Sequence, residues 1–195
     1  VSGGRPRYRM LETVRQYALE RLNECGEGEA TRDRHAAHFI AMAEEADSHV
    51  RGPDQDLWMN RFKQEHENLV VALTWCCDGP LDPQSGLRLA AATGYYWGWN
   101  SVEQGWRLVH AALEHDRAAA NTPARTDALR VLARLSLFRG RDEESLSFAT
   151  QALAAARQLG APQPLVWAVH AVGMALEALD RSQPALKAFQ GALEM

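Results

Sequence analysis

The stretch "GWRLVHAAL" at Gly105–Leu113 is the clearest indication of the fold, because a related pattern returns forty and eighty residues further along the chain. The later copies are "SLSFATQAL" at Ser145–Leu153 and "ALKAFQGAL" at Ala185–Leu193. Each copy begins with a small residue, continues with Trp or Leu and ends on an Ala-Leu pair, and Ala72-Leu73 extends the spacing upstream. A constant spacing of this kind is typical of stacked structural repeats.

Apolar residues recur at every third or fourth position along most of the chain, which predicts an all-α protein. The pairs Asp82-Pro83 and Thr122-Pro123 have the form of helix starts, with a capping oxygen before a proline. Only Arg7–Leu11 has the pattern of a short strand. We expect helices near residues 11–25, 28–50, 54–77, 83–99, 101–116, 123–139, 142–159, 162–179 and 182–194.

Connections after residue 80 are short, so consecutive helices should form antiparallel hairpins that bury their apolar faces by stacking. The first helices of the hairpins share one stripe at the same spacing, namely Leu89, Ala92 and Thr93, then Leu129, Leu132 and Ala133, then Val169, Val172 and Gly173. This pattern resembles the tetratricopeptide repeat, with a longer period. The resemblance predicts a right-handed α-α superhelix of three hairpins over residues 81–195, with a period of about forty residues.

The front of the chain carries a second resemblance. It lies in "RYRMLETVRQYALERL" at Arg7–Leu22, "RHAAHF" at Arg34–Phe39 and "RGPDQDLWMNRFKQEHENLVVAL" at Arg51–Leu73. This run resembles the segment that joins a nucleotide-binding domain and winged helix to a tetratricopeptide-like sensor array in bacterial STAND-class ATPases. The resemblance implies that residues 1–25 end a winged-helix region and that residues 26–80 form a helical linker.

In that family the array follows a P-loop ATPase and often accompanies a LuxR-type DNA-binding domain, a SARP-type activator domain, a cyclase or a kinase. The resemblance therefore implies a non-catalytic sensor module in a bacterial transcriptional regulator. Its partners would be a protein or small-molecule inducer and the neighbouring ATPase and winged-helix domains. No G-x-x-x-x-G-K loop occurs here, so we expect no cofactor in this segment and ATP only in an upstream domain. The alternative is a free-standing adaptor that binds peptide segments.

Composition supports a binding module more than a nucleic-acid or membrane protein. The chain has 195 residues and a net charge of −4, so no bulk attraction to nucleic acid is expected. The three cysteines do not have the number or spacing of a disulfide framework, which favours a reducing, cytoplasmic setting. The longest apolar run, Leu165–Leu176, is too short to span a membrane. The first residue is Val1 and not Met, which favours a segment of a longer polypeptide.

No group of residues has the spacing of a catalytic or metal site. His35 and His38 lie on one helical face without a third ligand, and we expect them to pack or to face solvent. His66 lacks a nearby nucleophile, so a hydrogen bond at a helix junction is the preferred role. Cys76 and Cys77 point to different sides of a helix, which favours neither zinc binding nor redox exchange.

We expect a binding site on the concave side of the repeats, because the residues between the buried positions of the first helices should lie there. This position selects the groove residues Trp97, Asp127, Arg130, Arg134, Trp167, His170 and Glu177, together with Phe138 and Met174. Arginines beside tryptophans can hold an anionic ligand or an acidic peptide. The alternative is that Asp127 only pairs with Arg130 and that the tryptophans only fill gaps between helices.

Two further expectations concern apolar side chains. Within "GYYWGW" at Gly94–Trp99, Tyr96 should lie in the core, while Trp97 or Trp99 should be partly exposed. The last helix should expose Leu186, Phe189 and Leu193, which would favour a homodimer.

Overall fold

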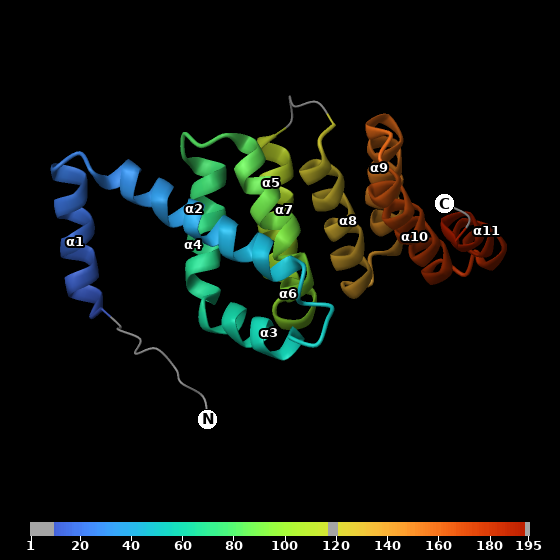
Figure 1. The fold of residues 1–195 in the computed structure, drawn as a ribbon, viewed down its shortest axis with the longest axis horizontal. Coiled ribbons are helices and arrows are strands. Elements are labelled where there is room, and N and C mark those ends of the chain that lie inside the picture. The colour runs from blue at the N-terminus through green and yellow to red at the C-terminus, as the bar shows by residue number, and fades with distance from the viewer. Residues whose placement is uncertain (1–9, 117–120, 194–195) are drawn as a thin grey trace.

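The computed structural model describes residues 10–116 and 121–193, and every regular element in these two ranges is a helix (Figure 1). The all-α prediction is therefore confirmed for this part of the chain. The predicted strand at Arg7–Leu11 falls mostly outside the described residues. The helices are α1 Glu12–Glu24, α2 Gly28–Asp47, α3 Gln55–Gln64, α4 His66–Asp78, α5 Pro83–Ala92, α6 Gly94–Asn100, α7 Val102–His115, α8 Pro123–Phe138, α9 Asp142–Leu159, α10 Pro162–Ala178 and α11 Ser182–Leu193.

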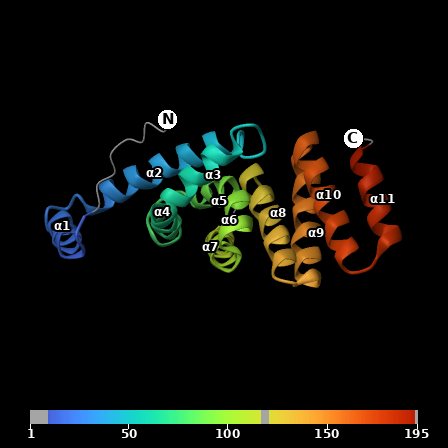
Figure 2. The same cartoon turned by 90° about the horizontal axis from the view of Figure 1, so that it is seen from below.

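The helices follow one another in space roughly as they do in the sequence, with α1 and α11 at opposite ends (Figure 1). Helices α8, α9, α10 and α11 stand side by side when the molecule is seen from below (Figure 2). Each of these four packs most extensively on its neighbour in the chain, while α8 also packs against α5 and α7. Short turns and neighbour packing of this kind fit stacked hairpins. The right-handed superhelix stays a prediction.

The turns inside the last two hairpins have the same geometry forty residues apart. Gly140 has a φ of 66° and Asp180 a φ of 56°, both in the left-handed region. In each turn the next N–H donates to a carbonyl five residues earlier: Arg141 to Ser136 and Arg181 to Leu176, both at 2.9 Å. This is the geometry of a Schellman-type helix end, which glycine favours and aspartate tolerates. The repeat is thus present in the backbone as well as in the sequence.

The small residues that open the second helices also occupy equivalent places. Gly105, Ser145 and Ala185 are all buried. Their N–H groups donate to carbonyls four residues earlier, at 2.8, 2.9 and 3.0 Å. A Cβ on Gly105 would lie 2.3 Å from the Cβ of Trp97, so only glycine fits there. Close helix crossing is therefore confirmed at Gly105, and the burial expected at Ser145 and Ala185 is confirmed.

Several side-chain hydrogen bonds join residues about one period apart. They tie each unit to the matching place in the next one, as repeat packing requires. Bonds of this kind join Gln55 to Tyr95, Gln84 to Thr122, Gly94 to Arg134, and Glu143 to Arg181.

Two predicted helices are broken in the structure. The helix expected at 54–77 is α3 and α4, which meet at Glu65, and α3 lies across the end of α4 (Figure 1). The helix expected at 83–99 is α5 and α6, which meet at Thr93. The hydroxyl of Thr93 donates to the carbonyl of Leu89 at 2.6 Å, a bond that commonly bends helices. A three-to-four spacing of apolar residues does not reveal such a break.

The core is continuous from Ala36 to Ala168 and crosses the boundary expected near residue 80. Eight of the nine residues in the predicted stripe are buried, and Val172 is half-buried. The leucines of the Ala-Leu pairs become more exposed along the chain. Leu73 and Leu113 are buried, whereas Leu193 is 87% exposed. The domain boundaries near residues 25 and 80 stay predictions.

Within residues 10–116 and 121–193, none of the helices has the length and apolar character needed to cross a membrane.

Candidate ligand-binding pocket

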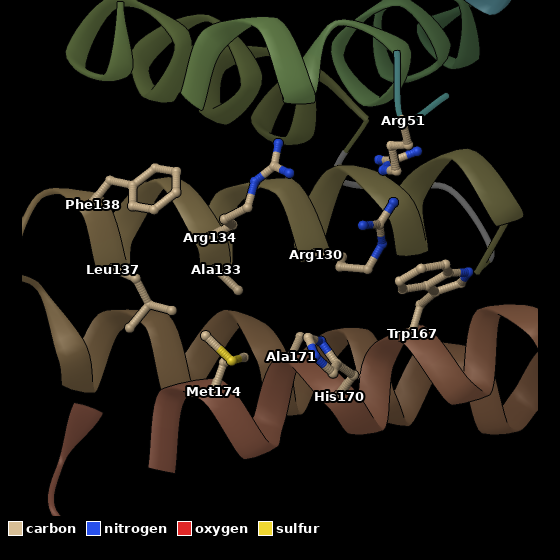
Figure 3. Close-up of a pocket in the computed structure, with 10 residues that line it drawn as sticks. All are labelled: Arg51, Arg130, Ala133, Arg134, Leu137, Phe138, Trp167, His170, Ala171 and Met174. Atoms are coloured by element: carbon tan, nitrogen blue, oxygen red, sulfur yellow. The ribbon is translucent and has the colours of Figure 1, made fainter. Parts of the chain in front are cut away.

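A pocket of about 210 Å³ lies between α8 and α10 and reaches the turn that joins α2 to α3 (Figure 3). Its walls combine arginines with apolar and aromatic side chains, and no carboxylate from the described residues lines it. The lining residues are Arg51, Arg130, Ala133, Arg134, Leu137, Phe138, Trp167, His170, Ala171 and Met174.

Helical spacing explains why two helices supply most of the wall. Arg130, Arg134 and Phe138 follow one another at four-residue steps, so they share one face of α8. On α10, His170 and Met174 have the same four-residue spacing and face α8 across the pocket (Figure 3). The pocket therefore results from two unbroken helices that pack side by side.

The guanidinium group of Arg134 is the most enclosed charge of the pocket. It donates from Nη2 to the carbonyl of Gly94, while its Nε is buried without a hydrogen-bond partner among the described residues. The guanidinium also lies 5.5 Å from the ring centroid of Tyr95. Burial lowers the pKa of Arg134 to about 10, with smaller contributions from the like charges of Arg130 and Arg51. Arg134 remains protonated at neutral pH, so its positive charge is held inside the protein.

The two other arginines lie at the rim and are each held by a carboxylate and a ring. Arg130 pairs with Asp127 at 3.2 Å and lies 5.7 Å from the ring centroid of Trp167. Arg51 pairs with Asp47 at 3.3 Å and lies 5.5 Å from the ring centroid of Tyr95. Partly exposed pairs of this type are weak and can exchange a partner for a ligand.

The structure brings together four of the seven predicted groove residues: Arg130, Arg134, Trp167 and His170. Phe138 and Met174, expected on the same side, also line the pocket. Asp127 lies beside it and pairs with Arg130, as the simpler alternative proposed. Glu177 is exposed and does not line it.

Sequence reasoning missed Arg51. It lies in the turn after α2, far from the repeats in sequence, and joins the pocket only through tertiary packing. No spacing rule relates a residue in such a turn to a helix face eighty residues later.

The placement of Trp97 in the groove was wrong. Trp97 is fully buried, and its indole Nε1 donates to the hydroxyl of Thr93 at 2.9 Å. The break at Thr93 separates α6 from α5, and the indole of Trp97 packs against Gly105 on α7. Tyr96 lies in the core, as expected, and Trp99 is the exposed tryptophan of this cluster.

The histidines considered for chemistry have packing roles. Nδ1 of His66, at the start of α4, is hydrogen-bonded to the hydroxyl of Tyr96 at 2.7 Å, which confirms the expected helix-junction bond. The rings of His35 and His38 contact the ring of Phe39, with centroids 4.7 and 5.0 Å apart. Burial lowers the pKa of His35. In the described part of the chain, no three His, Cys, Asp or Glu side chains gather as metal ligands would.

The sequence of this chain is similar to those of proteins named as transcriptional regulators. The chain is 34% identical over 178 residues to "Putative HTH-type transcriptional regulator Mb0914c" of Mycobacterium bovis and to "Putative HTH-type transcriptional regulator Rv0890c" of Mycobacterium tuberculosis. Each match covers 87% of this chain and 20% of the relative, so the chain spans about a fifth of the length of these relatives. No family model matches the chain. No solved structure matches it at a significant level.

Proposed function

We propose that this chain is a non-catalytic regulatory segment of a larger bacterial transcriptional regulator, and that it responds to a ligand bound in the pocket between α8 and α10. The similarity to relatives named as HTH-type transcriptional regulators supports the regulatory role. In this proposal the chain is the tetratricopeptide-like sensor part of a cytoplasmic STAND-class protein. ATP and DNA are bound by other parts of that protein.

The position of the pocket is the observation that carries the proposal. Arg51 belongs to the turn between α2 and α3, whereas the rest of the wall comes from α8 and α10. A ligand that contacts both parts would stabilise their present arrangement, since it binds that arrangement better than any other. Ligand binding in the pocket would then change the position of the helices near α1, and with it the surface that neighbouring domains contact.

The peptide-adaptor alternative receives less support from the pocket. An acidic peptide needs an extended groove, and a cavity of about 210 Å³ holds only one side chain of such a partner.

A transcript measurement with the full-length regulator tests the proposal without knowledge of the ligand. Strains would express the parent protein or a variant with Arg130→Gln or Trp167→Ala, and a strain without the regulator gene would define the regulated genes. Arg181→Gln is the matched control, because it removes an exposed ion pair with Glu143 outside the pocket.

We expect both pocket variants to change transcripts of the regulated genes, while the Arg181→Gln strain matches the parent. Pocket variants that accumulate normally and regulate like the parent would overturn the proposal.

A further inference from the structure

We propose that the pocket binds a small amphiphilic anion: a carboxylate carried on one apolar ring or on a short apolar chain of similar size. This inference rests on the proposed function, because it names the ligand class of the same site. Three properties of the pocket lead to it, namely its charged end, its apolar end and its size.

The charged end is formed by arginines from two separate parts of the chain. Arg51 and Arg130 lie close to Trp167 at one end of the pocket, and Arg134 follows next along α8 (Figure 3). The chain as a whole has a net charge of −4, so this concentration of positive charge is a local feature. Guanidinium groups bind carboxylates through paired N–H donors, and enclosure strengthens such bonds.

The enclosed positive charge of Arg134 favours the binding of an anion in the pocket. Its charge is enclosed and lies near the like charges of Arg51 and Arg130, whose effect the carboxylate of Asp47 offsets in part. In the described part of the chain it has no ion pair with a carboxylate, in contrast to the two rim arginines. An anion placed among the three groups would offset both the burial of this charge and the repulsion between them.

The opposite end of the pocket is apolar. Leu137 from α8 faces Met174 from α10 there, and Phe138 lies at the same end with its ring beside Gly98 (Figure 3). Phe138 and Met174 are 54% and 40% exposed. An apolar ligand body would cover them and gain free energy from the area removed from water.

The volume of the pocket suits one ring with its carboxylate. An apolar cavity of about 150 Å³ is known to accommodate benzene. The present pocket has about 210 Å³, which leaves room for one further group the size of a carboxylate. A nucleotide would exceed this volume, and inorganic phosphate would leave the apolar end unused.

Binding to the 195-residue chain would be measured by titration calorimetry with benzoate, 3-phenylpropionate and hexanoate. Benzamide serves as the neutral analogue of benzoate, and inorganic phosphate serves as the anion without an apolar body. We expect at least one carboxylate to bind, and its neutral amide and phosphate to bind at least about tenfold more weakly, because a charged hydrogen bond is lost in one case and apolar contact in the other.

Variants of the chain test whether the carboxylate binds in this pocket. Arg130→Gln and Trp167→Ala should weaken the carboxylate at least about tenfold. Arg130→Lys should weaken it less than Arg130→Gln, since it keeps the charge and loses the paired geometry. Arg181→Gln should bind like the parent.

Equal binding of acid and amide, tighter binding of phosphate, or no binding by any of the three carboxylates would overturn this ligand class. Carboxylate binding that is unchanged in both pocket variants would overturn the site. These failures differ from failure of the proposed function, because the transcript measurement needs no added ligand. Pocket variants that alter transcripts while no carboxylate binds would remove the ligand class alone.

Discussion

The first hairpin, formed by α5, α6 and α7, differs from the two hairpins that follow it, although all three keep one spacing. Residues 97, 137 and 177 occupy equivalent positions in the three units. The first helix breaks at Thr93 in the first unit, and Trp97 is buried against Gly105. The first helices of the later units run unbroken, so Leu137 lines the pocket and Glu177 faces solvent.

This difference shows how one repeat can form either part of the core or the wall of a surface pocket. A break turns the end of the helix inward and adds aromatic side chains to the core. An unbroken helix keeps the same positions at the surface, where α8 and α10 form the pocket together.

Trp97→Ala should have the largest effect on stability. Trp97 is fully buried and hydrogen-bonded, so its removal should lower the free energy of unfolding by about 3–5 kcal/mol. Trp99→Ala is the matched control, because Trp99 is 70% exposed and should change stability by less than about 1 kcal/mol. Urea unfolding followed by circular dichroism measures both. Equal effects of the two variants would place Trp97 at the surface, as the sequence pattern alone predicted.

Gly105→Ala should be the next most damaging change. The added methyl group would meet the Cβ of Trp97 at 2.3 Å, and overpacking of this kind costs about 1–3 kcal/mol of unfolding free energy. Gly191→Ala is its control, because a Cβ there meets nothing within 4 Å. A neutral Gly105→Ala variant in the same urea experiment would mean that α6 and α7 do not cross closely.

Ser145→Ala should be neutral or stabilising, although it lies at the position equivalent to Gly105. The hydroxyl of Ser145 is buried without a hydrogen-bond partner among the described residues, so its removal should change the unfolding free energy by about +0.5 to +1 kcal/mol. Substitution by alanine thus has opposite effects at equivalent positions of the two units, because it adds a Cβ at Gly105 and removes a hydroxyl group at Ser145. A loss of more than about 1 kcal/mol would show that the hydroxyl has a partner in solution.

Arg181→Gln should have the smallest effect. The ion pair of Arg181 with Glu143 is largely exposed, and such pairs contribute about 0–1 kcal/mol. The unfolding midpoint should shift little, and the shift should disappear in high salt. A larger and salt-independent loss would mean that this pair organises the last two hairpins.

The all-α class and the equivalent turns forty residues apart were predictable because they depend on local spacing. The spacing of apolar residues predicted the helices of the last two hairpins, and small residues at equal intervals predicted where the helices cross. The breaks at Glu65 and Thr93 were missed because the spacing of apolar residues does not reveal where a helix bends. The break at Thr93 coincides with the close approach of Gly94 to Val131 on α8.

The candidate site was predictable to the extent that it follows one helix face. Arg130 and Arg134 share a face of α8, and their spacing alone placed them together. Arg51 was not predictable, because its position in the pocket depends on how α2 packs against α5. Trp97 was misplaced for the opposite reason, since the pattern assumes an unbroken helix at this position.

The claim most in need of a test is that one ligand contacts both the α2–α3 turn and the two unbroken helices α8 and α10. Hydrogen exchange of the chain, measured with and without a bound carboxylate, tests this claim. Binding should therefore slow exchange in residues 48–54 as well as in α8 and α10, and Arg51→Gln should abolish the effect in the turn. Protection confined to α8 and α10, or equal protection in parent and Arg51→Gln, would contradict the claim.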